Sequence, residues 1–210
     1  MRAGVVVQPV VLEGQLARLE PLTLGHALAL ARAASGNRDT FGYTWVPEGE
    51  AETRVYIEDA LGLQARGEDL PFATIDRASG DVVGCTRFLH IEYWNWPPGN
   101  PNDRGPEYPD ALEIGWTWLT AEAQRTGINR EAKYLMLRHA FEVFRVHRVQ
   151  LITDSRNSRS RRAIEALGCR LDAVIRASRD GRDGIVRETA LFSMLESEWP
   201  AARAALAARR

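Results

Sequence analysis

The 210-residue chain has few of the features that mark disulfide-bonded, membrane or nucleic-acid-binding proteins. Its two cysteines, Cys85 and Cys169, have a spacing that fits neither a disulfide framework nor a metal knuckle, so we expect buried, reduced thiols. No apolar run approaches a membrane span, and the short run at residues 4–7 ends too soon for a signal peptide. The formal net charge of −1 argues against nucleic acid or an anionic membrane as partner.

Lysine is nearly absent as well. Lys133 is the only lysine, and with the many alanines this bias towards arginine is typical of GC-rich bacterial genomes. The apolar fraction of 45% and the charged fraction of 26% are those of a globular protein that stays in solution. We therefore expect one cytoplasmic domain over residues 1–210, with a loose arm at residues 1–10 and a tail helix at residues 197–210.

Strand and helix patterns alternate along the chain. Strand patterns occupy residues 11–22, 71–77, 81–93, 112–119, 147–154, 169–178 and 185–195. Helix patterns occupy residues 24–34, 50–66, 128–145 and 157–168. The second pattern is apolar at Val55, Ile57 and Leu61, and the third predicts a broad buried stripe of Ile128, Ala132, Leu135, Met136, Ala140, Val143 and Phe144. The predicted order is therefore strand, two helices, three strands, helix, strand, helix and two strands, which is a mixed α/β arrangement.

Residues 112–133 carry the strongest local signal. Large apolar residues alternate with small or polar ones at the start of this stretch, which predicts a strand with one bulky apolar face. The apolar residues are Leu112, Ile114, Trp116 and Trp118. After a turn-like segment, Gly127 opens a helix whose first N–H groups and dipole favour an anion, and glycine lets that anion approach the backbone. The pattern indicates a phosphate site, although an ordinary strand-to-helix turn fits it equally.

Two motifs then indicate a family. Residues 124–129 (QRTGIN) have neither the Gly-Lys-Ser/Thr of a Walker loop nor the three glycines of a dinucleotide fingerprint. They resemble the Gln/Arg-x-x-Gly-x-Gly/Ala pyrophosphate loop of the GNAT acetyltransferases, with Asn129 where Gly or Ala is usual. Residues 157–169 resemble the family's Asn-x-x-Ser/Ala-x-x-Leu-Tyr-Glu-Lys-x-Gly-Phe. The order of elements is also that of the family, so the resemblance covers about residues 12–195.

The resemblance implies a fold and a subgroup. The GNAT fold is a mostly antiparallel, seven-stranded central sheet with about four flanking helices, splayed between its fourth and fifth strands. Residues 113–116 (EIGW), with Gly127-Ile128 and Glu131-Ala132 after them, look most like the RimJ/RimL group. That group acetylates protein N-termini and has relatives that act on small amines.

The resemblance also implies acetyl-CoA as co-substrate, no metal, and direct attack by a primary amine in a ternary complex. The loop would hold the pyrophosphate, and the end of the fourth strand would pair with the pantetheine arm. The expected cofactor-binding residues are Thr117, Trp118, Leu119, Arg125, Thr126, Gly127, Ile128, Asn129, Arg130, Asn157 and Ser160. Asn157 also fits the role of a helix cap.

Glu113 is the candidate general base, because it projects from the polar face of the strand two places before Gly115, where space is left. A structural glutamate paired with an arginine fits the same pattern. The tyrosine that many GNATs carry is replaced by Ile164, so the leaving thiolate would take its proton from water or the product amine, with Ser160 a remote alternative. We expect no covalent route through a cysteine, and structural or surface roles for His26, His90, His139 and His147.

Two loops are expected to carry the acceptor specificity. Residues 35–50 contain Phe41, Tyr43 and Trp45, and fit a lid, an acceptor wall or a loop that its aromatic residues anchor. The insertion at residues 94–106 fits an acceptor pocket, a subunit contact or a solvated loop. Polyamine or antibiotic acceptors would be favoured by acidic residues, for which the candidates are Asp103, Glu107 and Asp110. A CoA-binding protein without turnover is the other alternative, and a homodimer fits the family resemblance.

Overall fold

The computed structural model describes residues 6–181 and 183–208. The strands are β1 (Leu12–Glu13), β2 (Ala17–Pro21), β3 (Leu70–Asp76), β4 (Val82–Glu92), β5 (Ala111–Leu119), β6 (Arg148–Asp154), β7 (Arg170–Asp180) and β8 (Val186–Leu195). The α-helices are α1 (Ala27–Ala34), α2 (Gly49–Ala65), α3 (Ile128–Glu142), α4 (Ser158–Glu165) and α5 (Trp199–Ala207). Short 3₁₀ turns, η1 (Leu24–His26), η2 (Arg38–Phe41) and η3 (Glu196–Glu198), complete the described elements.

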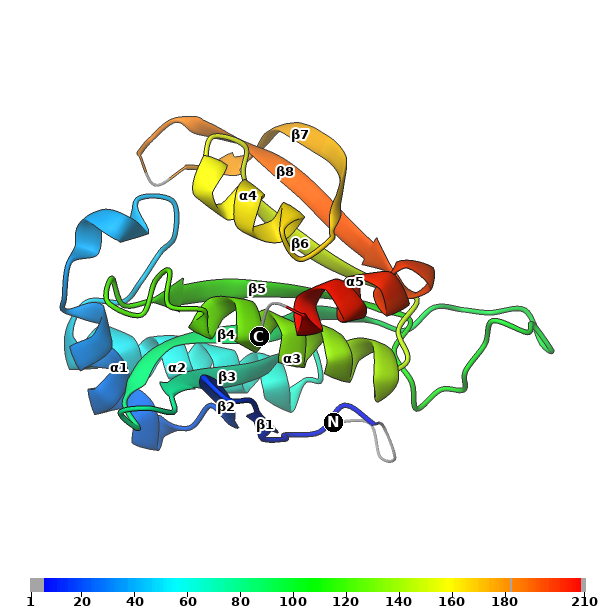
Figure 1. Cartoon of the computed structure of the whole chain (residues 1–210), viewed down its shortest axis with the longest axis horizontal. Coiled ribbons are helices and arrows are strands. Elements are labelled where there is room, and N and C mark those ends of the chain that lie inside the picture. The colour runs from blue at the N-terminus through cyan, green and yellow to red at the C-terminus, as the bar shows by residue number, and fades with distance from the viewer. Residues whose placement is uncertain (1–5, 182, 209–210) are drawn as a thin grey trace.

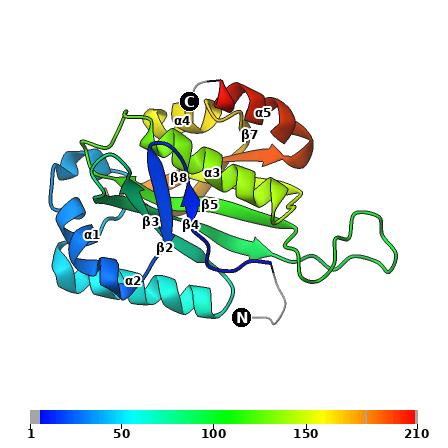
Figure 2. The same ribbon diagram turned by 60° about the horizontal axis from the view of Figure 1, so that its bottom comes forward.

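All strands join one sheet, in the order β1-β2-β3-β4-β5-β6-β8-β7. α1 and α2 cover one face, and α3, α4 and α5 lie on the other (Figures 1 and 2). The predicted mixed α/β GNAT arrangement and element order are confirmed. The strand count was wrong: eight strands lie in the described part of the chain, because residues 11–22 form two short strands instead of one. None of the described helices is long and apolar enough to cross a membrane.

β5 and β6 are parallel neighbours that soon separate. Their paired residues are Ala111 with Arg148, Leu112 with Val149, and Glu113 with Gln150. Beyond Glu113, β5 continues to pair with β4 and β6 continues to pair with β8, so each strand keeps one partner while the two diverge (Figure 1). The predicted splay is confirmed, and its narrow end lies at Glu113.

A β-bulge interrupts β5 just past this point. Arg87 of β4 faces Gly115, whereas Cys85 faces Trp118, so two residues of β5 oppose one residue of β4. Trp116, the first of the two, has a φ of +49°, a left-handed conformation that is costly for a bulky residue.

The bulge makes the predicted alternation of β5 wrong. Leu112 and Ile114 pack in the core that α3 covers, as expected, but Trp118 joins the cluster beneath α1 and α2 on the opposite face. Trp116 is 44% exposed, so it belongs to neither core. A period of two cannot survive an extra residue, because every side chain after the bulge changes face.

α3 lies across the sheet and supplies much of the larger core. Its apolar stripe is buried as predicted except at Val143, which follows the helix and is exposed. Glu131 in the first turn is also buried, and its Oε2 accepts hydrogen bonds from the N–H groups of Leu16 (2.5 Å) and Ala17 (2.8 Å). This carboxylate therefore ties the start of β2 to α3.

Three further expectations have mixed outcomes. Part of the predicted arm lies outside the described residues, and Val7 in the rest is buried against the larger core. In α2 the buried face contains Tyr56 and Ile57, whereas Val55 is exposed, contrary to prediction. The tail helix is confirmed, with Trp199 buried and stacked on Phe141 at 5.5 Å between ring centroids.

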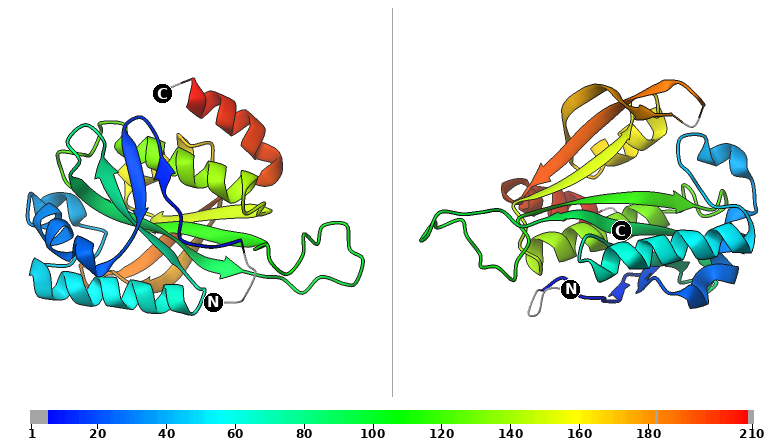
Figure 3. Two further views of the ribbon diagram at one scale, coloured as in Figure 1. Left: turned by 90° about the horizontal axis from the view of Figure 1, so that it is seen from below. Right: turned by 180° about the vertical axis from the view of Figure 1, so that it is seen from behind.

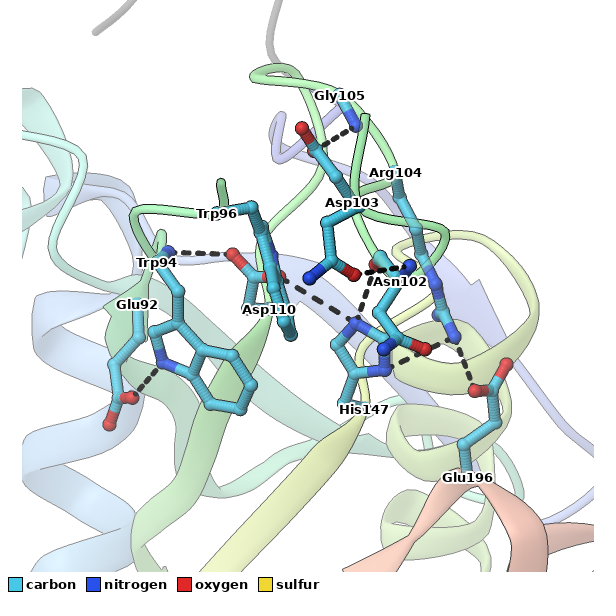
Figure 4. Close-up of polar contacts among 11 residues, drawn as sticks. Glu92, Trp94, Trp96, Asn102, Asp103, Arg104, Gly105, Asp110, His147 and Glu196 are labelled. Carbon is cyan, nitrogen blue, oxygen red and sulfur yellow. Dashed lines mark hydrogen bonds and ion pairs between the residues drawn. The ribbon is translucent and has the colours of Figure 1, made fainter. Parts of the chain in front are cut away.

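The segment between β4 and β5 projects from the end of the sheet at which β5 begins (Figures 1 and 3). Its base is fixed by the buried carboxylate of Asp110, which accepts hydrogen bonds from Trp94 N and Trp96 Nε1, both at 2.6 Å (Figure 4). The His147 ring stacks on Trp94 at 5.8 Å, and Arg104 pairs with Glu196 (Figure 4). The loop is long, but both of its limbs are tied to the body of the protein.

We predict that Asp110→Asn loosens this loop. The NH₂ group of the new amide would face either Trp94 N or Trp96 Nε1, both of which are donors. The lost hydrogen bond would destabilise the closed loop by about 1–3 kcal/mol. Limited proteolysis of the folded protein should then cut residues 97–106 about tenfold faster, since 1.4 kcal/mol is tenfold in a local opening equilibrium. Asp103→Asn is the matched control, because within the described part of the chain the Asp103 carboxylate accepts only from Gly105 N at the loop tip. Equal cleavage of the two variants would contradict the anchoring role of Asp110.

Candidate active site

Glu113 lies at the last paired position before β5 and β6 diverge, and it is 3% exposed. Its Oε2 accepts a hydrogen bond from Gln150 Nε2 at 3.1 Å and lies 3.3 Å from His90 Nδ1. The space that Gly115 leaves is used by this carboxylate, since a Cβ on Gly115 would lie 3.0 Å from Glu113 Oε1. Among the described residues its ion-pair partner is His90, not the arginine of the structural alternative.

The surroundings of Glu113 raise the proton affinity of its carboxylate. Burial raises the pKa of Glu113, and the nearby His90, Gln150 and Arg179 offset part of that rise. A carboxylate with a raised pKa takes a proton near neutral pH more readily than a solvated one. The expected surface or structural role of His90 is therefore incomplete: its own ring is exposed, yet it contacts the candidate base.

A buried arginine supports the bulge beside Glu113. The guanidinium of Arg87 lies over the rings of Trp116 (4.7 Å) and Tyr56 (5.2 Å), and its Nη1 donates to Asp69 at 3.1 Å. This cluster holds the strained tryptophan in place from the α2 side of the sheet.

Both cysteines are free and buried, as predicted. Cys85 Sγ lies 2.9 Å from the Tyr56 hydroxyl, and burial raises the pKa of the Cys85 thiol to about 11. Burial likewise raises the pKa of Cys169 to about 12. A neutral buried thiol is a poor nucleophile, so the structure favours direct transfer without a covalent cysteine intermediate.

The predicted phosphate loop lies at the other end of β5. Gly127 has a φ of +98° and caps the start of α3, and a Cβ there would lie 3.0 Å from Leu16 Cδ1. Thr126 Oγ1 donates to Ala123 O at 2.7 Å, which tightens the turn before the helix. Arg125 and Arg130 are exposed beside it. A glycine in a left-handed conformation, a helix start and two arginines fit a pyrophosphate group.

The remaining predicted cofactor residues fall into two groups. Trp118, Leu119 and Ile128 are buried, so only their backbone groups are available to a ligand. Thr117 and Asn129 are half-buried near the diverging strands and the start of α3. Their contacts with acetyl-CoA stay predictions.

α4 faces the phosphate loop across the divergence. Asn157 caps this helix, with its side-chain oxygen accepting from Ser160 N at 3.0 Å, so the capping role is confirmed and a cofactor contact stays a prediction. Arg159, which no sequence signal marked, donates to Gln124 Oε1 at 2.8 Å and to Thr40 O at 2.7 Å. One side chain therefore links α4 to the phosphate loop and to the loop between α1 and α2.

The aromatic residues of residues 35–50 divide between two of the predicted roles. Phe41 is buried and packs edge-on against Trp118 at 5.9 Å, which anchors the loop. Trp45 is 39% exposed and packs on Tyr56, while Tyr43 is exposed under the guanidinium of Arg156. The latter two are therefore the residues available to an acceptor.

Sequence reasoning also missed Lys133, the only lysine of the chain. It is buried on α3, and its Nζ donates to the hydroxyls of Thr86 (2.7 Å) and Thr117 (2.6 Å). Burial lowers the pKa of Lys133 to about 7. Its rarity was the one available signal, because an apolar residue is the usual choice at a buried helix position.

Comparison with known proteins agrees with this geometry. Residues 17–170 match the model of the acetyltransferase (GNAT) domain, so the chain belongs to the GNAT family and is an acyl-CoA-dependent N-acetyltransferase. A GCN5-related N-acetyltransferase from Brucella melitensis is 30% identical, with a TM-score of 0.80 over 96% of this chain and 85% of that chain. No curated protein matches the chain.

More distant structures share the fold. RimJ of Mycobacterium smegmatis, solved in complex with CoA-disulfide, has 19% identity and a TM-score of 0.76 over 96% of this chain and 92% of that one. The ribosomal-protein-S5-alanine acetyltransferase of Vibrio fischeri has 18% identity and a TM-score of 0.69, over 90% and 98% of the two chains.

We predict that Gly127→Asp abolishes acetyl-CoA binding through charge. Two unit charges about 4 Å apart repel by about 4 kcal/mol at an effective dielectric of about 20, which exceeds a 100-fold loss in affinity. Gly127→Ala is the matched control, since it carries the same backbone strain and the same contact with Leu16 but no charge. Calorimetry should show measurable binding for the alanine variant and none for the aspartate variant. Equal affinities would place the pyrophosphate elsewhere.

Proposed function

We propose that this protein transfers the acetyl group of acetyl-CoA to the N-terminal amine of a peptide or protein, as the RimJ/RimL resemblance implies. The observation that carries this proposal is the buried Glu113 at the narrow end of the diverging strands, within reach of the free part of β5. Attack takes place in a ternary complex, because no activated nucleophile is available on the protein among the described cysteines.

In this proposal acetyl-CoA extends from the start of α3 along the end of β5 that does not pair with β6. The pyrophosphate lies at the start of α3, with Arg125 and Arg130 beside it. The pantetheine arm pairs with Thr117, Trp118 and Leu119, which lie beyond the last residue of β5 that pairs with β6. A strand that lacks a neighbour on one side offers N–H and C=O groups to an extended ligand, and one such N–H would polarise the thioester carbonyl.

The acceptor side favours amines without many positive charges. Asp110 is bound to Trp94 and Trp96, and Asp103 caps the loop tip, so two of the three acidic residues that would favour polycations have other partners. Arg179 and Arg187 face each other across β7 and β8, and neither has an ion-pair partner among the described residues.

These two arginines lie close enough to the candidate base to affect it. Burial raises the pKa of Glu113 and the charge of Arg179 offsets part of that rise, while burial and then the charge of Arg179 lower the pKa of Arg187. Such a lining would repel polyamines and aminoglycosides, which are polycations, and would tolerate a peptide with carbonyl or carboxylate groups.

The proton chemistry supports the same acceptor class. An α-amino group has a reference pKa of about 7.7–8.0, compared with about 10.4 for a lysine-type amine. Near neutral pH, removing a proton from an α-ammonium group therefore costs a carboxylate base less free energy than removing one from a lysine-type ammonium group. Glu113 therefore suits an N-terminal amine better than a more basic one.

The test of the proposed function is a thiol-release assay with acetyl-CoA near neutral pH. The amines are short peptides with free N-termini, the same peptides with blocked N-termini, spermidine and an aminoglycoside. We expect release of free CoA with the unblocked peptides and the acetyl group on their N-terminal nitrogen by mass spectrometry. Turnover with spermidine or the aminoglycoside, and none with the unblocked peptides, would overturn the acceptor assignment.

We predict that Glu113→Gln lowers kcat by roughly 10²–10⁴, the usual range for a positioned general base. The variant keeps an oxygen for Gln150 Nε2, so affinity for acetyl-CoA and thermal stability should hardly change. The defect should shrink as pH rises, because more of the amine is then already deprotonated. Glu188→Gln, at an exposed carboxylate on β8, is the control. A pH–rate profile identical to wild type would show that Glu113 is a structural residue.

A further inference from the structure

The proton donor for the leaving thiolate is missing from its usual place. Ile164, which replaces the tyrosine of the family motif, is buried in the core on the α3 side of the sheet. A hydrocarbon side chain cannot donate a proton, so another group on this side has to replace it or the thiolate has to leave unprotonated.

Lys133 is the unexplained polar group on the same side. Among the described residues it forms no ion pair, and the partners of its ammonium are the hydroxyls of Thr86 and Thr117. Burying a cation without a carboxylate is expensive, and an apolar side chain of similar length would fill the same space at lower cost. Groups of this kind are typical of functional sites.

The Thr117 hydroxyl connects this ammonium to the site. Thr117 is the second residue of the β5 bulge, lies beyond the last pair with β6, and is half-buried, whereas Lys133 is buried. Its Oγ1 accepts from Lys133 Nζ at 2.6 Å, lies 2.9 Å from Thr86 Oγ1, and is 3.3 Å from Gly115 O. The contact with Gly115 O is long, so the hydroxyl hydrogen can turn to another acceptor.

We propose that Lys133, acting through the Thr117 hydroxyl, supplies the proton that the departing CoA thiolate takes up. This step rests on the proposed acetyl transfer. As the amine nitrogen bonds to the carbonyl carbon and the C–S bond breaks, the sulfur takes the proton of Thr117 Oγ1, which takes one from Lys133 Nζ. The protons that Glu113 removes from the amine pass to solvent, and Lys133 regains one by the same path after product release.

The electrostatic surroundings of Lys133 fit this role. The titratable group that acts on Lys133 is the Cys85 thiol of β4, which burial keeps protonated. On α3, the Glu131 carboxylate is hydrogen-bonded to the start of β2. The hydroxyls of Thr86 and Thr117 carry no charge. A pKa of about 7 lets Lys133 be charged before the reaction and give up its proton during it. In this scheme Lys133 positions and delivers a proton, and Thr117 touches the sulfur.

The first test uses the fact that the chain has one lysine. Protein labelled with ¹⁵N at the lysine Nζ should give a single side-chain resonance, with a midpoint near pH 7. Addition of CoA should raise that midpoint through the nearby sulfur, whereas desulfo-CoA, which has the same pyrophosphate and pantetheine but no sulfur, should leave it unchanged. An equal response to both ligands would overturn the proposal.

The second test uses paired variants of the full chain. Thr117→Val and Lys133→Met should each lower kcat by roughly 10²–10⁴ with little change in acetyl-CoA KM, and Thr117→Ser, which retains the hydroxyl, should lower kcat far less than Thr117→Val. The double variant should lose no more than either single one, because both interrupt one path. Full activity of Thr117→Val would overturn the proposal.

Stability separates this role from a structural one. The pKa of Lys133 is lowered in the folded state, so the unfolded chain binds the proton more strongly between about pH 7 and the ordinary lysine value of about 10.4. Stability of the wild type should therefore rise with pH in this window relative to Lys133→Met, which should melt at or above the wild-type Tm near neutral pH. A Lys133→Met variant that is unstable but fully active per folded molecule would show a structural lysine.

The two proposals fail separately. Absence of thiol release by the wild type with every amine would refute the proposed acetyl transfer. The comparison of CoA with desulfo-CoA does not depend on turnover, so it still decides whether Lys133 responds to the sulfur.

Discussion

The separation of β5 from β6 after Glu113 is the constraint on which the rest of the structure depends. Each strand keeps a full partner on its outer side, β4 or β8, so the sheet remains continuous while its middle opens. An unpaired strand edge is normally a liability in a sheet. Here it lies between the start of α3 and the buried carboxylate of Glu113, which is why we propose that the thioester of acetyl-CoA lies along this edge.

The bulge in β5 determines where the side chains of Trp116 and Thr117 point. By placing Trp116 and Thr117 opposite one residue of β4, it turns Trp116 towards Arg87 and Thr117 towards Lys133. Burial raises the pKa of Glu113 and lowers that of Lys133, so a carboxyl and an ammonium that would otherwise titrate far apart both approach neutrality. Shifts of this kind are typical of functional sites.

Local patterns predicted the elements but not their details. The glycine at the start of α3 and the asparagine cap of α4 depend on a few consecutive residues, and both were predicted correctly. The face of Trp118 was predicted wrongly, because the bulge is set by the register with β4, which lies outside the segment. Val55 was assigned to the core on period alone, whereas the packing of α2 buries Tyr56.

The sequence by itself determined the order of elements and the family, because periodicity and motifs are properties of short segments, and it marked Gly127 and Glu113 as the predicted phosphate loop and base. Only the tertiary structure decided which residues surround Glu113, and that Asp110 of the insertion anchors the base of its own loop. The same holds for Lys133: in the sequence it is an ordinary charged residue of a helix, and only the tertiary structure shows that it is buried against the sheet. Burial and contacts between distant segments determine the pKa values of these groups and the hydrogen-bond partners of the hydroxyls. Such contacts cannot be deduced from any short stretch of the chain.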